Sequence, residues 1–172
     1  NAQRLLLLVN QLMDLRKNQS GNLQLRVSHN DLYLFTQEIY IAFNQIAVKE
    51  RIIFRLESDE SGIDAWFDRV LLEKVFFNLL SNAFKHTAPD EAITIRLQLF
   101  SVAGLQEQFP GRISGEVRGT SRYVCLSVED TGKGIDDSDK FHIFSPFYQG
   151  TDESESNTAG TGIGLSLVLS IV

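Results

Sequence analysis

The sequence predicts an α+β fold, a two-layer α/β sandwich in which a mixed sheet has helices packed on one face. Segments in which apolar and polar residues alternate, as in strands, are interspersed with segments that have apolar residues at helical spacing. Of the 172 residues, 43% are hydrophobic, which is enough for one globular core but not for two full-sized domains. We therefore expect one domain with a short appendage.

The appendage is a helix predicted over Asn1–Lys17. Its apolar residues recur at alternating steps of three and four, as in a helix that packs against a partner: Leu5, Leu8, Leu12 and Leu15. A polar break at residues 18–22 ends this helix. We place the domain boundary there, with residues 1–20 in the appendage and residues 21–172 in the main domain.

The main domain is predicted to mix helices and strands along the chain. Its two long helices start after an aspartate or asparagine that can cap them, and its strands alternate apolar and polar residues. The expected elements are, in order, a half-buried strand Leu23–Val27, a helix from Asn30 or Asp31 to Val48, strands Ile52–Leu56 and Asp64–Trp66, a helix from the Asp68 cap to about Thr87, and strands Ile93–Leu99 and Val124–Val128.

Two further stretches show neither periodicity. The glycine-rich insert Ser101–Ser121 predicts a long hairpin loop between the last two strands. The polar run Gly150–Thr158 predicts a mobile lid, and the aromatic segment Phe144–Tyr148 before it is expected to pack the base of that lid on the core. The glycine cluster Gly160–Gly164 then opens a final apolar helix.

Charge and composition exclude several classes of function. A net charge of -6 opposes binding to a polyphosphate backbone, so no nucleic-acid partner is expected. The early apolar run Leu5–Val9 is too short to cross a bilayer, and we expect no direct membrane contact by these residues. Cys125 is the only cysteine, which fits a reducing compartment, and its place in an apolar strand predicts a buried, inert thiol.

The helix that follows Asp68 bears two amides on an otherwise apolar sequence. Asn78 and Asn82 are four residues apart and therefore project from the same face, with Lys85 beside them. An amide oxygen can ligate Mg²⁺, an amide NH₂ can bond a phosphate oxygen, and a lysine can neutralise a further charge. Taken alone, the same three residues fit an exposed polar helix face equally well.

The strand that ends at Asp130 delivers a carboxylate to its end, followed by Thr131, Gly132, Lys133 and Gly134. Two glycines let the backbone turn tightly against whatever the carboxylate holds. A buried carboxylate that accepts a bond from an exocyclic amine selects adenine over guanine, which presents an acceptor at that position. An ordinary Asp-Thr-Gly turn between two elements is the equally weighted alternative.

The glycine cluster at Gly160–Gly164 places a flexible loop directly before a helix. Backbone N–H groups and the positive end of the helix dipole can bind phosphates there. The spacing does not fit a dinucleotide-fold fingerprint, and the Gly-Lys-Ser/Thr ending of a Walker A loop does not occur in the chain.

In this order, the four segments closely resemble the N, G1, F and G2 boxes of sensor histidine kinases. That family belongs to the GHKL ATPase superfamily, which has the Bergerat fold and includes gyrase, the ninety-kilodalton heat-shock chaperones and mismatch-repair ATPases. The resemblance runs from about Leu23 to the C-terminus. Asn1–Lys17 in turn resembles the end of the second helix of the family's dimerisation and phosphoacceptor hairpin.

The resemblance implies an ATP and Mg²⁺ site. The two asparagines would serve Mg²⁺ and phosphate, with Asn78 as the metal ligand, and Lys85 would face phosphate. His86 would lie beside the adenine, and Asp130 would hold the adenine amine. The glycines would shape the base pocket or let the lid close: Gly132, Gly134, Gly160, Gly162 and Gly164. The other residues assigned to the nucleotide are Ile135, Phe147, Thr161 and Leu165.

The resemblance also implies a function. The domain would position Mg-ATP for γ-phosphoryl transfer to a histidine of the hairpin, outside this sequence, and onward to a response-regulator aspartate. No residue here is then needed as a nucleophile, and His29 and His142 are expected to have structural or exposed roles. The implied partners are the hairpin, a receiver domain and a second copy in a homodimeric kinase. The implied location is the cytoplasmic part of a membrane-anchored sensor.

Two other functions remain open from the sequence. An ATPase or chaperone module of the same superfamily would hydrolyse ATP with a glutamate in the N-box helix, for which Glu73 is the nearest candidate. A degenerate dimerisation domain that no longer binds nucleotide is the second alternative, although the asparagines, Asp130 and the glycines are all retained.

Overall fold

The computed structural model describes residue 13 and residues 24–111, 122–150 and 161–172. Apart from Met13, the expected first helix and the boundary at residue 20 lie outside the described residues, as does Gly160. The elements are β1 (Ser28–Asp31), α2 (Leu32–Glu50), β2 (Ile53–Ser58), β3 (Asp64–Phe67), α3 (Arg69–His86), β4 (Ala92–Phe100), α4 (Val102–Gln108), β5 (Tyr123–Asp130) and α5 (Gly164–Ile171).

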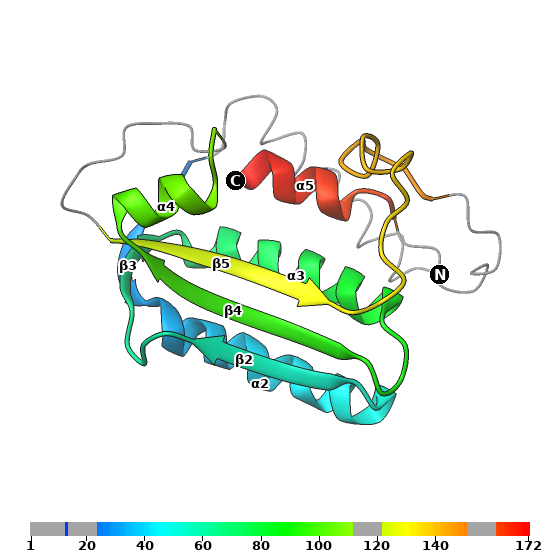
Figure 1. Cartoon of the computed structure of the whole chain (residues 1–172), viewed down its shortest axis with the longest axis horizontal. Helices are drawn as coiled ribbons and strands as arrows, with labels where there is room; N and C mark the ends of the chain where they lie inside the picture. Colours follow the sequence, from blue (N-terminus) through cyan, green and yellow to red (C-terminus); the bar gives the residue numbers. More distant parts are fainter. Residues whose placement is uncertain (1–12, 14–23, 112–121, 151–160) are drawn as a thin grey trace.

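The predicted mixed sheet is confirmed (Figure 1). Strand β4 lies in the middle, parallel to β2 and antiparallel to β5. The antiparallel register runs from the pair Ile93 and Asp130 to the pair Phe100 and Tyr123. A separate antiparallel pair is formed by β1 and β3. The four strands predicted after residue 50 and both long helices therefore exist, with boundaries shifted by at most two residues.

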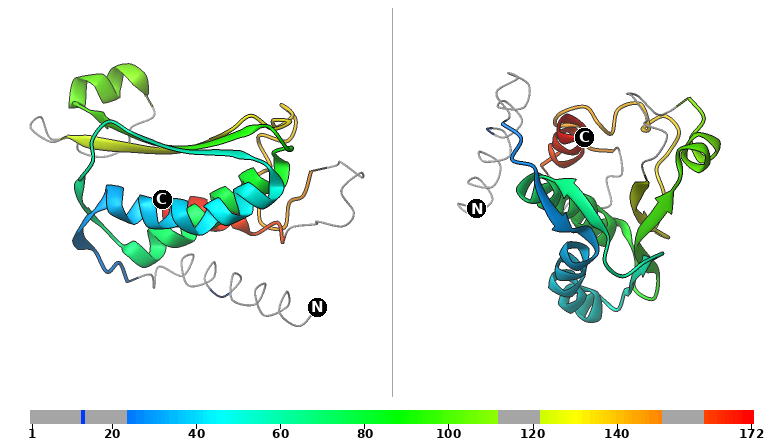
Figure 2. Two further views of the ribbon diagram at one scale, coloured as in Figure 1. Left: turned by 90° about the horizontal axis from the view of Figure 1, so that it is seen from below. Right: turned by 90° about the vertical axis from the view of Figure 1, so that its left-hand side faces the viewer.

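The core lies between the three-stranded sheet and the helices. Figure 2 (left) shows the sheet and the helices α2, α3 and α5 as two layers, with α4 on the other side of the sheet. The β4 side chains of Ile93, Ile95 and Leu97 are fully buried on the helix side. They meet buried residues of α2 and α3: Leu32, Phe35, Ile39, Phe43, Ala47, Phe76, Leu80 and Ala83.

The other face of the sheet is polar. Arg96 of β4 bonds Glu57 of β2 at 3.0 Å and Glu129 of β5 at 2.7 Å, so one guanidinium links all three strands. Cys125 opposes Gln98 and is half-buried, not fully buried as expected. Partial burial raises the pKa of the Cys125 thiol, and the Glu129 charge adds to this, so the thiol is poorly nucleophilic.

The strand predicted over Leu23–Val27 is wrong for residues 24–27, and Leu23 lies outside the described residues. Leu25 and Val27 are exposed, and β1 begins at Ser28. Its partner β3 ends at Phe67, and the next residue, Asp68, bonds the Arg26 amide at 2.7 Å with its side chain. A carboxylate therefore takes the place of a strand partner, and residues 24–27 pair with no strand in the described part of the chain.

The insert between the last strands joins an antiparallel pair, as predicted, but its first part is a helix and not a loop. The Ser101 hydroxyl caps α4 by accepting a hydrogen bond from the Gly104 amide at 3.2 Å. Residues 112–121 of the insert lie outside the described residues. Among the described residues, no helix combines the length and the hydropathy that crossing a bilayer requires.

Asp68 stabilises α3, and its removal is expected to be measurable. The carboxylate accepts hydrogen bonds from the amides of Arg26, Val70 and Leu71. The Arg26 amide, followed by those of Leu71 and Val70, lowers the pKa of Asp68. Asp68→Ala should lower the free energy of unfolding by about 1 kcal/mol at neutral pH. Urea unfolding followed by circular dichroism measures this loss.

The lowered pKa of Asp68 also predicts how the stability lost in Asp68→Ala depends on pH. Because the folded pKa of Asp68 is depressed, its stabilisation is present above the unfolded pKa of about 3.9 and is lost as pH falls through the folded value. The difference between wild type and Asp68→Ala should therefore shrink below about pH 4. Asp137→Ala removes a carboxylate that pairs with Lys140 on the surface and should change little. Equal losses in both variants would contradict the capping argument.

Candidate functional site

Helix α3 forms one wall of the candidate site. It is continuous from Arg69 to His86, so Asn78 and Asn82 lie on one face with Lys85 next to them. All three side chains are half-buried, whereas Phe76 and Leu80 on the opposite face are fully buried in the core. The asparagine face is thus turned away from the core and partly covered by other parts of the chain.

Asn78 meets the start of α5. Its Nδ2 donates to the Lys74 carbonyl at 2.7 Å, which fixes the amide and turns Oδ1 away from its own helix. A Cβ placed on Gly164 would lie 2.8 Å from that Oδ1. The start of α5 therefore lies in close contact with the Asn78 side chain, and an oxygen acceptor lies beside the first turn of α5. Ile163, the N-cap of α5, makes no side-chain capping bond.

Asp130 meets the other end of α3. It pairs with Ile93, whose buried side chain points toward the helices, so the Asp130 carboxylate lies on the helix side of the sheet. Its Oδ1 accepts the Gly132 amide at 3.0 Å. A Cβ on Gly132 would lie 2.2 Å from the His86 carbonyl oxygen, so the loop after β5 packs directly on the end of α3.

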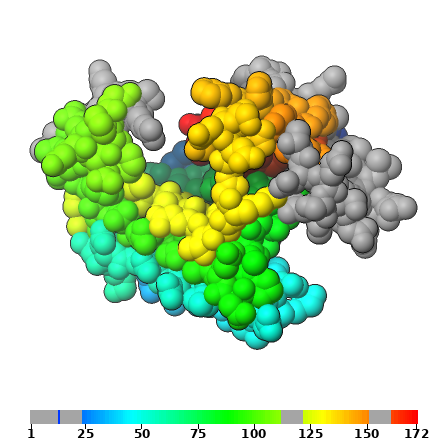
Figure 3. Space-filling model, turned by 45° about the vertical axis from the view of Figure 1, so that its right-hand side comes forward, coloured from blue at the N-terminus to red at the C-terminus, as the bar shows by residue number. Residues whose placement is uncertain are grey.

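The aromatic and final glycine segments also meet. The Phe147 amide donates to the Gly162 carbonyl at 2.8 Å. Together these contacts connect the four segments: Gly164 meets Asn78, the loop after Asp130 meets His86, and the aromatic segment meets Gly162. Figure 1 shows α5 beside α3 and the loop after β5 passing the end of α3. Figure 3 shows the surface hollowed between α4 and residues 131–150.

Several details differ from the sequence predictions. The Asp130 carboxylate is exposed, not buried, because it stands at the end of an edge strand and no chain segment among the described residues covers it. The expectation that the aromatic segment packs on the core is wrong: Phe144 is 41% and Phe147 60% exposed. Ile135, assigned to the nucleotide, is also exposed. Thr161 and Leu165 are half-buried.

Two threonines that were not predicted as site residues, Thr131 and Thr87, lie next to the candidate site. The Thr131 hydroxyl accepts the Ala92 amide at 3.0 Å and the Thr131 amide donates to the Ala92 carbonyl, which fixes the loop after Asp130 to β4. Thr87, next to His86, has a buried hydroxyl oxygen with no hydrogen-bond partner in the described part of the chain. The Asp-Thr-Gly sequence gave a signal for Thr131, whereas nothing in the sequence distinguishes Thr87.

The donor set at this site suits a hard cation shared with a ligand. The described residues contain no group of three or more His, Cys, Asp or Glu side chains that could hold a metal. A metal here would instead take the Asn78 amide oxygen together with ligand and water oxygens, which is how Mg²⁺ is commonly bound with phosphates. The orientation of Asn78 Oδ1 toward Gly164 fits this mode of binding.

Other candidates are less suitable. Glu73 is exposed and lies five residues before Asn78, so it projects about 140° away around the helix. His29 and His142 are exposed and contact Trp66 and Tyr148 as aromatic pairs.

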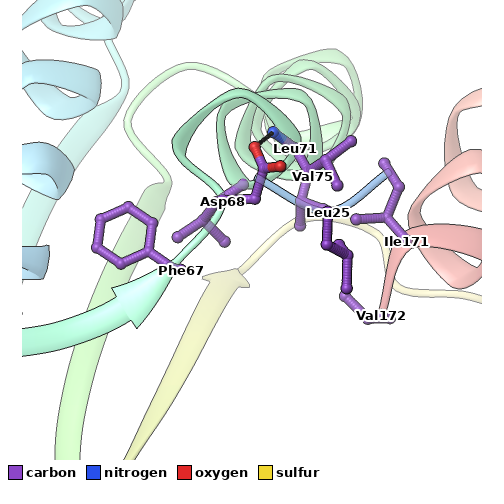
Figure 4. A pocket seen from close by; sticks show the side chains of 8 residues that line it. Leu25, Phe67, Asp68, Leu71, Val75, Ile171 and Val172 are labelled. Atoms are coloured by element: carbon purple, nitrogen blue, oxygen red, sulfur yellow. Dashed lines mark hydrogen bonds between the residues drawn. The ribbon is translucent and has the colours of Figure 1, made fainter. Parts of the chain in front are cut away.

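A pocket of roughly 170 Å³ lies between the start of α3 and the end of α5 (Figure 4). Its lining is almost entirely apolar: Leu25, Phe67, Asp68, Leu71, Leu72, Val75, Ile171 and Val172. The Asp68 carboxylate is already used to cap α3, so this pocket has no polar group to offer a nucleotide.

Comparisons with known proteins agree with the geometry. The sequence model of the family described as "Histidine kinase-, DNA gyrase B-, and HSP90-like ATPase" matches residues 67–172. Histidine kinase P4 of Formosa agariphila is 30% identical over 99% of this chain. The chain spans 11%, 10% and 16% of the lengths of the first three curated relatives.

Solved structures show the same similarity. The catalytic domain of histidine kinase ThkA is 26% identical with a TM-score of 0.64, and the alignment covers 86% of this chain and 81% of that chain. The same kinase in complex with response regulator protein TrrA gives a TM-score of 0.62 at 24% identity, covering 86% of this chain and 37% of that chain.

Proposed function

The chain belongs to the histidine kinase-, DNA gyrase B- and HSP90-like ATPase family, and from this premise we propose that it is the ATP-binding catalytic domain of a two-component sensor histidine kinase. The observation that carries the proposal is that both candidate groups lie along α3. Asn78, midway along the helix, contacts Gly164 at the start of α5, and the loop held by the Asp130 carboxylate packs on His86, the last residue of α3. A purine triphosphate needs an acceptor for its base at one end and a cation site for its phosphates at the other.

Each residue then has a chemical role. The Asp130 carboxylate accepts the exocyclic amine of adenine, while Gly132 and Gly134 form the turn beneath the base, beside His86. Asn78 provides an oxygen ligand for Mg²⁺, and Asn82 and Lys85 contact phosphate oxygens. The first turn of α5 offers backbone amides to the phosphates. The remaining residues of the proposed nucleotide site are Ile135, Phe147, Gly160, Thr161, Gly162, Gly164 and Leu165.

The domain acts by positioning and charge neutralisation. When bound, Mg²⁺ neutralises charge on the β- and γ-phosphates. The chain's own residues hold the triphosphate so that its γ-phosphoryl group faces a histidine presented by a phosphoacceptor hairpin, and no side chain here is a nucleophile. We propose that residues 1–20 are the end of that hairpin and that residues 21–172 form the catalytic domain.

The proposed partners follow from the same assignment. The phosphoryl group passes from the histidine to an aspartate of a response-regulator receiver domain; ThkA, to which this chain is similar, has been solved with a response regulator protein. The kinase is proposed to work as a homodimer on the cytoplasmic side of a membrane-anchored sensor. A sensor histidine kinase and a virulence sensor protein are among the relatives of this chain.

Titration with a fluorescent ATP analogue tests the proposal directly. Saturable binding that ATP displaces and that strengthens with Mg²⁺ is expected. Absence of binding would favour a degenerate dimerisation domain. Steady-state ATP turnover that disappears in Glu73→Ala, with binding retained, would favour the hydrolysing ATPase.

Because the proposed phosphoacceptor is a histidine of the hairpin, we expect little self-phosphorylation of these 172 residues. His29 and His142 are exposed, but each rests against an aromatic ring, and neither is proposed as the acceptor. Incubation with γ-labelled ATP should leave almost no acid-labile phosphate on the chain, whereas addition of the kinase's hairpin should restore labelling of the hairpin. Strong labelling of His29 or His142 would overturn the proposed acceptor.

A further inference from the structure

Phe147 and Gly162 form a close backbone contact, which we call the clasp. The Phe147 amide donates to the Gly162 carbonyl at 2.8 Å. A Cβ on Gly162 would lie 2.7 Å from the Phe147 carbonyl carbon and 2.8 Å from its Cα. No side chain larger than hydrogen fits at Gly162, so the two backbones are in direct contact.

Both residues of the clasp have a left-handed backbone, with φ of 66° at Phe147 and 68° at Gly162. Glycine adopts this conformation readily, but for a phenylalanine it costs about 1–2 kcal/mol. Burial of the ring does not offset the cost, because the Phe147 side chain is 60% exposed. The clasp hydrogen bond and the packing on Gly162 therefore hold Phe147 in a conformation that its side chain disfavours.

The segment next to Phe147 is itself anchored. The Tyr148 hydroxyl donates to Asp139 at 2.7 Å, and the Tyr148 amide donates to the Ser145 carbonyl. A Cβ on Gly162 would also lie 2.9 Å from the Tyr148 carbonyl oxygen. Gly162 thus rests on a segment that its own hydrogen bonds keep in place.

The clasp is two residues from the start of α5. Gly164, the first residue of α5, lies against Asn78 Oδ1, the oxygen proposed as the Mg²⁺ ligand. Fixing Gly162 therefore fixes the position of the first turn of α5 relative to Asn78.

We propose that Phe147 is a positioning residue of the nucleotide site, which acts through its left-handed backbone and not through its ring. It holds Gly162, and through Gly162 the start of α5, beside Asn78. This inference rests on the proposed nucleotide binding. Sequence resemblance assigned Phe147 to the nucleotide site without saying how it acts there.

Three substitutions separate the effect of the backbone conformation at Phe147 from the effect of its ring. Each removes the ring, but they differ in how readily they adopt a positive φ. Phe147→Gly and Phe147→Asn keep access to the left-handed region, whereas the β-branched Phe147→Val does not. Titration with a fluorescent ATP analogue in the presence of Mg²⁺ should give Kd values within about threefold of wild type for the first two, and a loss of at least about tenfold for Phe147→Val, which corresponds to 1.4 kcal/mol. Without Mg²⁺ the loss in Phe147→Val should be smaller.

The outcomes are distinguishable. Equal losses in all three variants would show that the ring contacts the nucleotide, and wild-type Kd values in all three would show that the clasp is dispensable; either result overturns the inference. If wild type itself binds no nucleotide, the proposed function fails instead. Thermal unfolding confirms that each variant is folded. Should Phe147→Val not fold, Phe147→Thr takes its place, because threonine is also β-branched and disfavours the left-handed region more than phenylalanine does.

Discussion

Replacing Asp130 with alanine is expected to weaken binding of an ATP analogue by about ten- to a hundredfold, the equivalent of losing one hydrogen bond to a charged group. The carboxylate lies on the helix side of the sheet, at the end of β5, and is exposed to a ligand. Its Oδ1 also holds the Gly132 amide, so the variant loses the acceptor for adenine and the support of the turn beneath it. Fluorescence titration measures the loss.

Glu129 provides a matched control for this prediction. It is the neighbouring carboxylate of the same strand, but it bonds Arg96 on the opposite face of the sheet. Glu129→Ala should therefore bind the analogue as wild type does. If both variants lose affinity equally, the effect comes from the strand and not from a base contact.

Asp130→Asn tests the choice of base. An asparagine amide can donate to the guanine O6 acceptor, which a carboxylate cannot do. The variant should lose affinity for ATP and gain in relative affinity for GTP, measured by competition against the fluorescent analogue. A variant that keeps the wild-type preference for ATP would place the adenine contact elsewhere.

Much of the fold was predictable because local chemistry determines it. Asp68, and either Asn30 or Asp31, were predicted as helix caps from their position before apolar residues at helical spacing, and Asp31 and Asp68 accept amides from the first turn of a helix. The alternation in Ile93–Leu99 placed three residues on the buried face of β4. These signals extend over a few residues and need no knowledge of distant contacts.

One error arose where a distant contact decides the structure. Leu23–Val27 has the alternation of a strand, but Asp68 takes the Arg26 amide from 42 residues away. The other error concerns a local signal: the Ser101 hydroxyl accepts the Gly104 amide three residues further on and caps α4, where the glycine content of the insert had indicated a loop.

The residues of the candidate site were predicted from the sequence and their assignment stays a prediction, whereas the contacts among them could not be predicted. The order of the four segments pointed to Asn78, Asn82 and Asp130 before any coordinates. The left-handed backbone of Phe147 and its contact with Gly162 could not be inferred, because phenylalanine gives no signal of a positive φ and the two residues are 15 positions apart. The conclusion that the aromatic segment acts through its backbone required the structure.

The second large effect is expected at Asn78. Asn78→Ala should reduce γ-phosphoryl transfer in the full-length kinase by about a hundredfold, the range seen when an electrostatic contact to the reacting group is removed. In the 172-residue chain it should abolish the Mg²⁺-dependent part of nucleotide affinity and leave Mg²⁺-free binding nearly unchanged. The physical reason is that the amide oxygen beside Gly164 is the protein's own contribution to the proposed cation site.

Asn78→Asp separates the ligand oxygen from the amide. The carboxylate keeps an oxygen for Mg²⁺, but when ionised it cannot donate to the Lys74 carbonyl as the Asn78 amide does. It should therefore retain Mg²⁺-dependent binding with reduced affinity, placing it between wild type and Asn78→Ala. Ser81→Ala, at an exposed position of the same helix, should resemble wild type. Mg²⁺-dependent affinity that survives intact in Asn78→Ala would mean that the cation is held without this side chain, and the assignment of α3 as the metal-binding helix would have to be abandoned.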